Sequence, residues 1–405
     1  MSFERRWADL EPLGRAAGGG YRRYAWTSED AVLREWFAGE ADRLGLSLTV
    51  DRAGNQWAWW GDPDADGPGV VTGSHLDSVP DGGAFDGPLG VVSALTAVEA
   101  LQGEGFRPAR PLGVVNFADE EGARFGVACA GSRVITGALT PERAAGLTDG
   151  DGTALGAAMR GAGLNPDHLG RDDEALRRIS SFVELHVEQG RALVDDGSPV
   201  GVATAIWPHG RWRFEFLGEA NHAGTTRLAD RKDPMIDYAN AVLAARQLAM
   251  GTYDAVATFG KVLVDPNGVN AIPSRVRAWL DARAPEEVEV LGLVTDLAKA
   301  AAAAGALVAE ESWTGATEFD ADLSRRVATA AAEGLGTSRM PLLGTGAGHD
   351  AGILAAAGVP AAMLFVRNPT GVSHSPAEFA ERDDCLAGVT ALTAVLRELA
   401  GAGIG

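Results

Sequence analysis

The sequence predicts an α/β fold in which an open sheet flanked by helices forms the larger domain and a smaller α+β domain is inserted into it. Two apolar runs, residues 69–71 and 112–117, indicate buried strands, and a helix of small residues at 89–101 lies between them. Within residues 208–318 the order becomes strand, helix, strand, strand, helix, strand. This order is the split βαβ pattern, an antiparallel sheet with helices on one side.

Chain length and the order of elements set the expected domains. The chain has 405 residues, which allows two or three domains of about 100–200 residues each. The strand–helix alternation of the first part resumes after the inserted segment. We therefore expect a discontinuous domain, residues 1–207 and 319–405, around an inserted domain, residues 208–318.

Composition limits the possible partners and location. There are 35 basic and 55 acidic residues, a net charge of −20, which argues against nucleic acid as a partner because phosphate binding needs basic patches. No run of about 18 apolar residues occurs, so no membrane span is expected, and the N-terminus lacks the apolar core of a signal peptide. The two cysteines, Cys129 and Cys385, lie far apart, which is typical of a reducing cytoplasm rather than a disulfide framework.

The first elements of the larger domain are expected to be helical and then to form a strand pair. Residues 1–47 favour helix, with Ser28 as the N-cap of a helix that continues through Leu44, because two acids follow that serine. Residues 48–50 and 55–60 alternate between polar and apolar side chains, as paired strands do.

Further along the chain, residues 133–180 are expected to be helical, and residues 182–190 alternate with period two as a strand. Proline near the first turn of a helix and apolar alternation in strands place six elements in the inserted domain. These are expected at residues 211–217, 233–250, 255–264, 274–281, 285–305 and 306–311.

A loop rich in glycine, proline and aspartate follows the first buried strand, within residues 72–90. It holds His75, Asp77 and Asp86. The imidazole of His75 offers a metal ligand, Asp77 can hold the other ring nitrogen, and Asp86 is free to coordinate and even to bridge two ions. The alternative is a polar turn with a chance histidine, since such loops are common.

A second acidic loop follows the strand at 112–117, where Asp119, Glu120 and Glu121 are adjacent. Sites in open α/β sheets form at the carboxyl ends of strands. Neighbouring side chains diverge, so one glutamate could bind a metal while the other acts as a general base. The alternative is a solvated loop, which is common in an acidic protein.

Three more histidines of the larger domain are candidates. His186 lies in the alternating strand, His349 at a helix start in the glycine-rich segment 344–350, and His374 in a loop. A histidine in a strand is more often structural, and the glycine-rich segment resembles a phosphate cradle only weakly, because it lacks the lysine of a P-loop.

The inserted domain carries three candidates of its own. His222 lies in a loop after the first strand, Asn270 follows a Pro-Asn-Gly turn, and Arg283 ends a strand. Each has a structural alternative, since an asparagine beside glycine usually makes a turn and an arginine at a strand end usually makes a surface ion pair.

The histidine count supports a metal site. The chain has seven histidines, and five of them fall in loop or strand-end contexts of this kind. Three histidines with Asp86 and one glutamate give five ligands, a set suited to two ions that share a bridging carboxylate and leave positions open for water.

Six motifs, taken together and in this order, carry a resemblance to a known family: GSHLDSVPDGGAFDGPLG, FADEEGARFG, HVEQG, NHAGTT, GAGHDA and SHSPAE. The chain resembles the dinuclear-metal amidohydrolases related to aminoacylases and dipeptidases, in particular the N-carbamoyl-L-amino acid hydrolase, allantoate amidohydrolase and β-ureidopropionase branch. The resemblance covers nearly the whole chain. The motifs HVEQG and NHAGTT are similar to those of the carbamoylase and allantoate branch rather than the peptidases.

The resemblance implies two divalent metal ions per subunit, which could be Mn, Zn, Co or Ni, since the ligand types do not decide between them. It implies that Asp86 bridges the ions and that Glu120 is the general base, with Asp77 orienting His75. One ion would be bound by His75, Asp86 and His186, and the other by Asp86, Glu121 and His374.

The resemblance also implies a lid and dimerisation role for the inserted domain, and hence a homodimer. His222 would polarise the scissile carbonyl or stabilise the oxyanion. Residues expected to contact the substrate, in part through its carboxylate, are Gln189, Asn270, Arg283 and His349.

The expected function is metal-dependent hydrolysis of a carbamoyl or ureido C–N bond next to a carboxylate, in the cytoplasm. N-carbamoyl-L-amino acids and allantoate are the leading substrates, with a slight preference for allantoate from the surroundings of NHAGTT. One alternative is an aminoacylase or dipeptidase that uses the same metals. Another is a non-catalytic binding dimer, which would have lost a ligand or the base, and neither is lost here.

Overall fold

A computed structural model of the protein describes residues 2–401. The chain forms two compact units. The larger contains the residues up to Thr204 and from Glu318 onward, and the smaller is Ala205–Thr317. Each unit has its own hydrophobic core.

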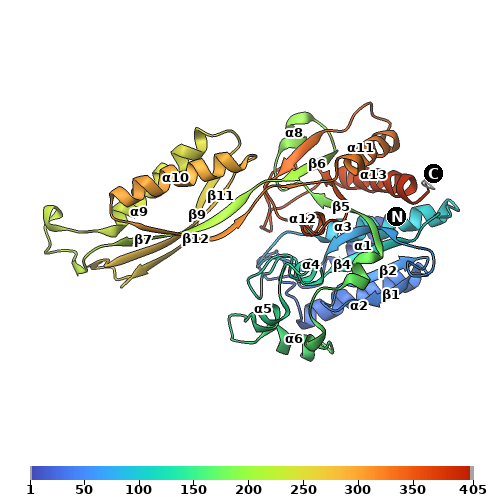
Figure 1. Cartoon of the computed structure of the whole chain (residues 1–405), viewed down its shortest axis with the longest axis horizontal. Coiled ribbons are helices and arrows are strands. Elements are labelled where there is room, and N and C mark those ends of the chain that lie inside the picture. Colours follow the sequence, from blue (N-terminus) through green and yellow to red (C-terminus); the bar gives the residue numbers. More distant parts are fainter. Residues whose placement is uncertain (1, 402–405) are drawn as a thin grey trace. The chain divides into compact units, whose positions relative to one another are not determined.

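The larger unit is built on a mixed sheet with helices on its faces (Figure 1), which confirms the predicted α/β fold. Across the described residues this sheet has nine strands in the order β1-β2-β4-β3-β5-β15-β6-β13, with β14 paired to β6. The strands are β1 Ser47–Val50, β2 Gln56–Trp60, β3 Gly69–His75, β4 Leu112–Phe117, β5 Ile179–Val187, β6 Val200–Ile206, β13 Thr317–Glu318, β14 Leu342–Thr345 and β15 Ala361–Val366.

The centre of this sheet is parallel. β3 pairs in parallel with β4 and β5, and β15 pairs in parallel with β5, whereas β1, β2 and β6 pair antiparallel. The four parallel strands are almost entirely buried, as expected for strands covered on both faces. Because they are parallel, their carboxyl ends lie at one edge, where His75 is in register with Phe117.

Helices α3 (Pro88–Gly103), α11 (Ala321–Leu335) and α13 (Arg382–Gly401) pack together, and α1 (Ser2–Leu10) packs on α3. Their apolar side chains and those of the central strands form the main core. Helices α4 (Ala130–Thr136) and α12 (Asp350–Ala356) also pack against each other. No helix among residues 2–401 is both long and apolar enough to cross a lipid bilayer.

The N-terminal expectation is only partly right. Residues 11–27 are not helical and separate α1 from α2 (Ser28–Arg43), because Gly14 and Gly19 take left-handed backbone conformations, with φ of 68° and 91°. Ser28 is not the N-cap. Thr27 has extended backbone and its hydroxyl accepts the amide of Asp30 at 3.4 Å.

The segment 133–180 is not continuous helix but a series of short pieces. They are α4, α5 (Pro141–Gly146), α6 (Leu155–Gly161), a 3-10 turn η1 (Pro166–His168) and α7 (Asp173–Arg177), and β5 already begins at Ile179. Glycines with positive φ follow α4, α6 and η1 and end the helical turns. The strand predicted for 182–190 ends at Val187. Beyond it, the Glu188 carboxylate accepts the amides of Ala192 and Leu193, at the start of helix α8 (Ala192–Asp196).

The smaller unit confirms the predicted α+β segment. Its described residues form a four-stranded antiparallel sheet in the order β12-β7-β11-β9, and Figure 1 shows α9 and α10 on one face of it. A second pair, β8 with β10, is separate from this sheet. The elements are β7 His209–Leu217, β8 Asn221–His222, a 3-10 turn η2 Leu228–Asp230, α9 Pro234–Met250, β9 Val256–Asp265, β10 Ala271–Ile272, β11 Arg275–Arg283, α10 Glu287–Ala303 and β12 Leu307–Thr314.

Candidate metal centre

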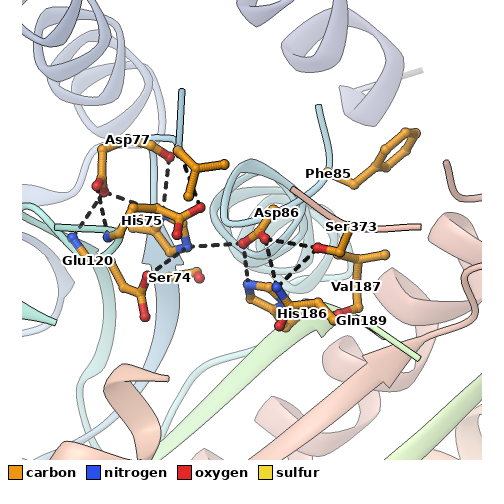
Figure 2. Close-up of polar contacts among 12 residues, drawn as sticks. Ser74, His75, Asp77, Phe85, Asp86, Glu120, His186, Val187, Gln189 and Ser373 are labelled. Atoms are coloured by element: carbon orange, nitrogen blue, oxygen red, sulfur yellow. Dashed lines mark hydrogen bonds and ion pairs between the residues drawn. The ribbon is translucent and has the colours of Figure 1, made fainter. Parts of the chain in front are cut away.

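Asp86 is the centre of a cluster of histidines at the carboxyl edge of the parallel strands (Figure 2). His75 ends β3, His186 is the penultimate residue of β5, and Asp86 lies in the loop before α3. Asp86 Oδ1 lies 3.1 Å from His186 Nε2 and 3.5 Å from His75 Nε2. Both histidines and the aspartate are buried.

The local backbone explains why the two histidines meet the aspartate. β3 and β5 are parallel neighbours, so their last residues lie side by side. Gly87, with φ of 83°, then turns the chain from Asp86 into α3. A Cβ at this position would lie 2.4 Å from the His75 ring, so only glycine lets the loop come this close.

The donor set fits a divalent cation. Among residues 2–401, the Nε2 atoms of His75 and His186 are buried and face carboxylate oxygens without a well-formed hydrogen bond, which is costly for polar atoms unless something else satisfies them. The opposite nitrogens are held: His75 Nδ1 lies 3.3 Å from Asp77 Oδ1, and His186 Nδ1 lies 2.9 Å from the carbonyl of Val187. Partners at Nδ1 favour the tautomer that leaves Nε2 free to coordinate.

A second group of possible ligands uses the other oxygen of Asp86. His374 Nε2 lies 3.4 Å from Asp86 Oδ2 and 3.7 Å from Glu121 Oε2. These three residues place one ligand atom each within 4.8 Å of one another, as do His75, Asp86 and His186. The structure thus brings together all five residues predicted to bind metal, in the two sets that were predicted, with Asp86 common to both.

Asp77 connects the histidine loop to the acidic loop after β4. Its two carboxylate oxygens accept the amides of Glu120 at 3.2 Å and Glu121 at 3.0 Å. Asp119, with φ of 55°, makes the turn that presents these two amides. The Glu120 side chain then lies with Oε2 3.7 Å from His75 Nε2. The turn therefore directs Glu121 to one ligand group and Glu120 to the space beside the other.

The electrostatics of the cluster favour a bound cation. Burial raises the pKa of Glu120 well above its usual value, and burial with the nearby Asp86 charge raises the pKa of Glu121 to about 7. The hydrogen bond to Asp86 raises the pKa of His374 to about 9. Burial opposes ionisation of Asp86, but the histidines around it, His186 first, hold its pKa well below the usual range. Crowded carboxylates of this kind bind divalent cations well, because a cation offsets their charge.

Two residues expected to contact substrate lie beside the ligands. Gln189 Nε2 donates to Asp86 Oδ2 at 2.8 Å and to Ser373 Oγ at 3.2 Å, and Gln189 Oε1 has no hydrogen-bond partner among the described residues. The His349 ring lies 4.5 Å from the His186 ring, and burial holds its pKa well below the usual value. Both residues therefore border the cluster.

The other three predicted residues belong to the smaller unit. β8 and β10 bring two of them together, since His222 pairs with Ala271, the neighbour of Asn270, and the Asn270 carbonyl accepts the amide of Ala223 at 2.9 Å. His222 is exposed. Arg283 ends β11 in the other sheet, where its guanidinium donates to Asp281 at 2.7 and 3.0 Å.

Two buried glutamates, neither of them predicted from the sequence as a site residue, support the cluster. Glu378 Oε1 accepts the amides of Phe85 and Asp86, both at 2.9 Å, and its Oε2 accepts from Ser373 Oγ at 3.2 Å. Glu184 accepts the Ser74 hydroxyl at 2.7 Å and the amide of residue 351 at 3.1 Å. Glu378 ends the motif SHSPAE, whereas Glu184 lies two residues before the motif HVEQG. The bonds of both residues reach segments far away in the sequence.

Comparisons with known proteins agree with this geometry. The family described as Peptidase family M20/M25/M40 matches residues 71–398. The chain is 36% identical over 409 residues to the N-carbamoyl-L-amino acid amidohydrolase of Geobacillus stearothermophilus, covering 98% of each protein. It is 32% identical over 401 residues to the allantoate amidohydrolase of Bacillus subtilis, covering 96% of this chain and 95% of that protein.

A solved structure has the same architecture. It is an amidase of the hydantoinase/carbamoylase family from Burkholderia multivorans, with a TM-score of 0.87 and 30% identity. The match covers 99% of this chain and 98% of the other.

Proposed function

The chain belongs to the M20/M25/M40 peptidase family, as a metal-dependent amidohydrolase of its hydantoinase/carbamoylase branch, and we propose that it hydrolyses the carbamoyl or ureido C–N bond of a small carboxylate substrate. N-carbamoyl-L-amino acids and allantoate are the proposed substrates. Relatives named for each of these substrates, at 36% and 32% identity, support both, and the slight preference for allantoate is drawn from the sequence around NHAGTT.

One observation carries this proposal: Asp86 lies between two sets of ligand atoms, with a carboxylate of Glu120 at their side. A ureido carbonyl is stabilised by two nitrogens, so its hydrolysis needs an activated water, a polarised carbonyl and a protonated leaving group. Divalent cations at such a site polarise the carbonyl and make water nucleophilic near neutral pH. We propose two of them, and Mn, Zn, Co and Ni all suit histidine and carboxylate ligands.

Proton transfer and the orientation of the metal ligands are proposed roles of the chain's own residues. We propose that Glu120 accepts a proton from the attacking water and passes it to the leaving nitrogen. The contact of Asp77 with His75 and with the amides of Glu120 and Glu121 supports an orienting role for Asp77.

Substrate contacts are proposed on both units. Gln189 and His349 border the ligand cluster. In the smaller unit, Arg283 offers a planar fork that suits a carboxylate, His222 would stabilise the oxyanion, and Asn270 would help to hold the carboxylate. A homodimer formed through the smaller unit, and a location in the cytoplasm, remain proposals from the sequence.

The test is product release by manganese-loaded protein on four compounds. Ammonia is measured with allantoate, N-carbamoyl-L-methionine and β-ureidopropionate, and methionine is measured with N-acetyl-L-methionine. The same protein stripped with a chelator is the control, and it should be inactive on all four.

Each outcome of this assay supports one of the candidate functions. Turnover of allantoate or of a carbamoyl compound supports the proposal and names the substrate. Turnover of the acetyl compound alone would make the protein an aminoacylase. No turnover of any compound by fully metal-loaded protein would favour a non-catalytic binding dimer.

A further inference from the structure

The proposed base, Glu120, has a buried neighbour, Cys129, that has no part in the proposed reaction. Cys129 Sγ lies 3.1 Å from Glu120 Oε1, in hydrogen-bond contact, and both side chains are buried. Burial raises the pKa of the Cys129 thiol well above its usual value, so the thiol keeps its proton and can donate it in the bond. The other carboxylate oxygen, Oε2, is the one that lies 3.7 Å from His75 Nε2 (Figure 2).

The backbone holds Cys129 in this place. Three consecutive amides, those of Cys129, Ala130 and Gly131, donate to the carbonyls of Glu120, Asp119 and residue 118. Cys129 is left-handed, with φ of 54°, immediately before α4 begins. A non-glycine residue rarely adopts this conformation, so the surrounding contacts must fix it.

Gly131 explains how close the two segments lie. A Cβ on Gly131 would come within 2.1 Å of Asn55 Oδ1 and 2.6 Å of the residue 118 carbonyl oxygen. The Asn55 side chain in turn accepts the amide of residue 118 at 2.8 Å. Cys129 is therefore fixed relative to the turn that carries Glu120, and its thiol points at one oxygen of that carboxylate.

We propose that Cys129 is a positioning residue for Glu120: its thiol occupies Oε1 and so directs Oε2 toward the ligand cluster, where a proton is to be taken up. The inference rests on the proposed role of Glu120 as general base. A thiol suits the task because it is a weak donor. It orients the carboxylate without stabilising the anion as strongly as a hydroxyl or amide would, so the glutamate keeps its basicity.

The experiment compares Cys129→Ala with Cys129→Ser. Both replacements place a small side chain on the same left-handed backbone, so they differ only in the presence of a donor. The matched control is Cys385→Ala, which removes the other buried cysteine, on α13. For each variant kcat and KM are measured on whichever of allantoate or N-carbamoyl-L-methionine is turned over, together with bound manganese and the melting temperature.

We expect Cys129→Ala to lose roughly tenfold in kcat with KM and bound manganese unchanged, in line with the loss of a single orienting hydrogen bond. Cys129→Ser should recover to within about threefold of the parent kcat, because a donor is restored. Cys385→Ala should keep the parent kcat.

Three results would overturn the inference. They are a parent-like kcat in Cys129→Ala, a serine variant no better than the alanine variant, or a kcat loss fully accounted for by lost manganese or lost folded protein. Glu120→Gln is assayed in parallel to test the base itself. Substantial activity in that variant would refute the assigned base, whereas an inactive Glu120→Gln beside a fully active Cys129→Ala would refute only the positioning role.

Discussion

The two ligand groups that meet at Asp86 are built in different ways. His75 is the last residue of β3 and His186 the penultimate residue of β5, both of them buried parallel strands. Their second nitrogens are held by Asp77 and by a backbone carbonyl. His374 lies in a loop with φ of 54°, its side chain 53% exposed. The strand-held group, His75 and His186 with Asp86, is fixed by the sheet, and the loop-held group, Glu121 and His374 with Asp86, is fixed by loops. We therefore expect the strand-held group to bind its ion more tightly. Binding at the loop-held group should depend on the residues that hold its loops in place.

The largest expected effect is a loss of kcat on replacement of Glu120, and it distinguishes catalysis from metal binding. Glu120→Gln should lower kcat by about 10²–10⁴-fold, because the general base is lost, while bound manganese stays at the parent amount. The paired variant Glu121→Gln should instead lose manganese from the loop-held group. Enzyme assays and metal analysis of the two variants test this, and a Glu120→Gln protein that turns over substrate well would contradict the assigned base.

The comparison itself is tested by removing one histidine from each group. His374→Ala should weaken the affinity for the loop-held manganese ion by about 10- to 100-fold and leave the strand-held ion bound. His186→Ala should instead abolish binding of the tighter, strand-held ion. Calorimetric titration of chelator-stripped protein resolves the two. Equal losses from both variants would show that the strand-held and loop-held groups do not differ as we infer.

Glu378 should matter for the loop-held group. Its carboxylate joins the Asp86 loop to Ser373, beside His374, so Glu378→Gln should weaken binding of the loop-held ion by about tenfold. The strand-held ion should be affected less, because His75 and His186 keep their own supports. Glu381→Gln, at an exposed position three residues on, is the matched control. The same titration measures both, and an unchanged second affinity in Glu378→Gln would show that the loop does not need this anchor.

The smallest expected effect is on KM, from replacement of Arg283, which belongs to neither ligand group. Arg283→Ala should raise KM for carboxylate substrates by several-fold or more and change kcat little, since a hydrogen bond to a charged group contributes about 1.5–3 kcal/mol. Arg211→Ala, which removes the other arginine paired with Asp281, controls for the loss of that ion pair. Steady-state kinetics decide the matter, and a parent-like KM would remove Arg283 from the carboxylate site.

The same contrast explains what the sequence could predict. The strands that end at His75 and Phe117 and the acids after them follow from apolar runs and loop composition, which are local patterns. The support from Glu378 could not be predicted, because its bond to the Asp86 amide joins residues 292 positions apart. The cap at Thr27 was missed because Ser28 and Thr27 are both good cap residues, and only the backbone angles distinguish them.

The position of Asp86 between the two groups has a consequence for how the protein would respond to metal supply. If two cations bind here as proposed, they would not bind independently, because the first would fix the orientation of Asp86 and change the charge that the second meets. Their binding would then be linked by a coupling free energy, and each ion would alter the affinity for the other by the same factor. If both ions are needed for turnover, activity at limiting metal would rise more steeply than in proportion to free cation. Where the tighter site is already filled, activity would instead follow the occupancy of the loop-held site alone.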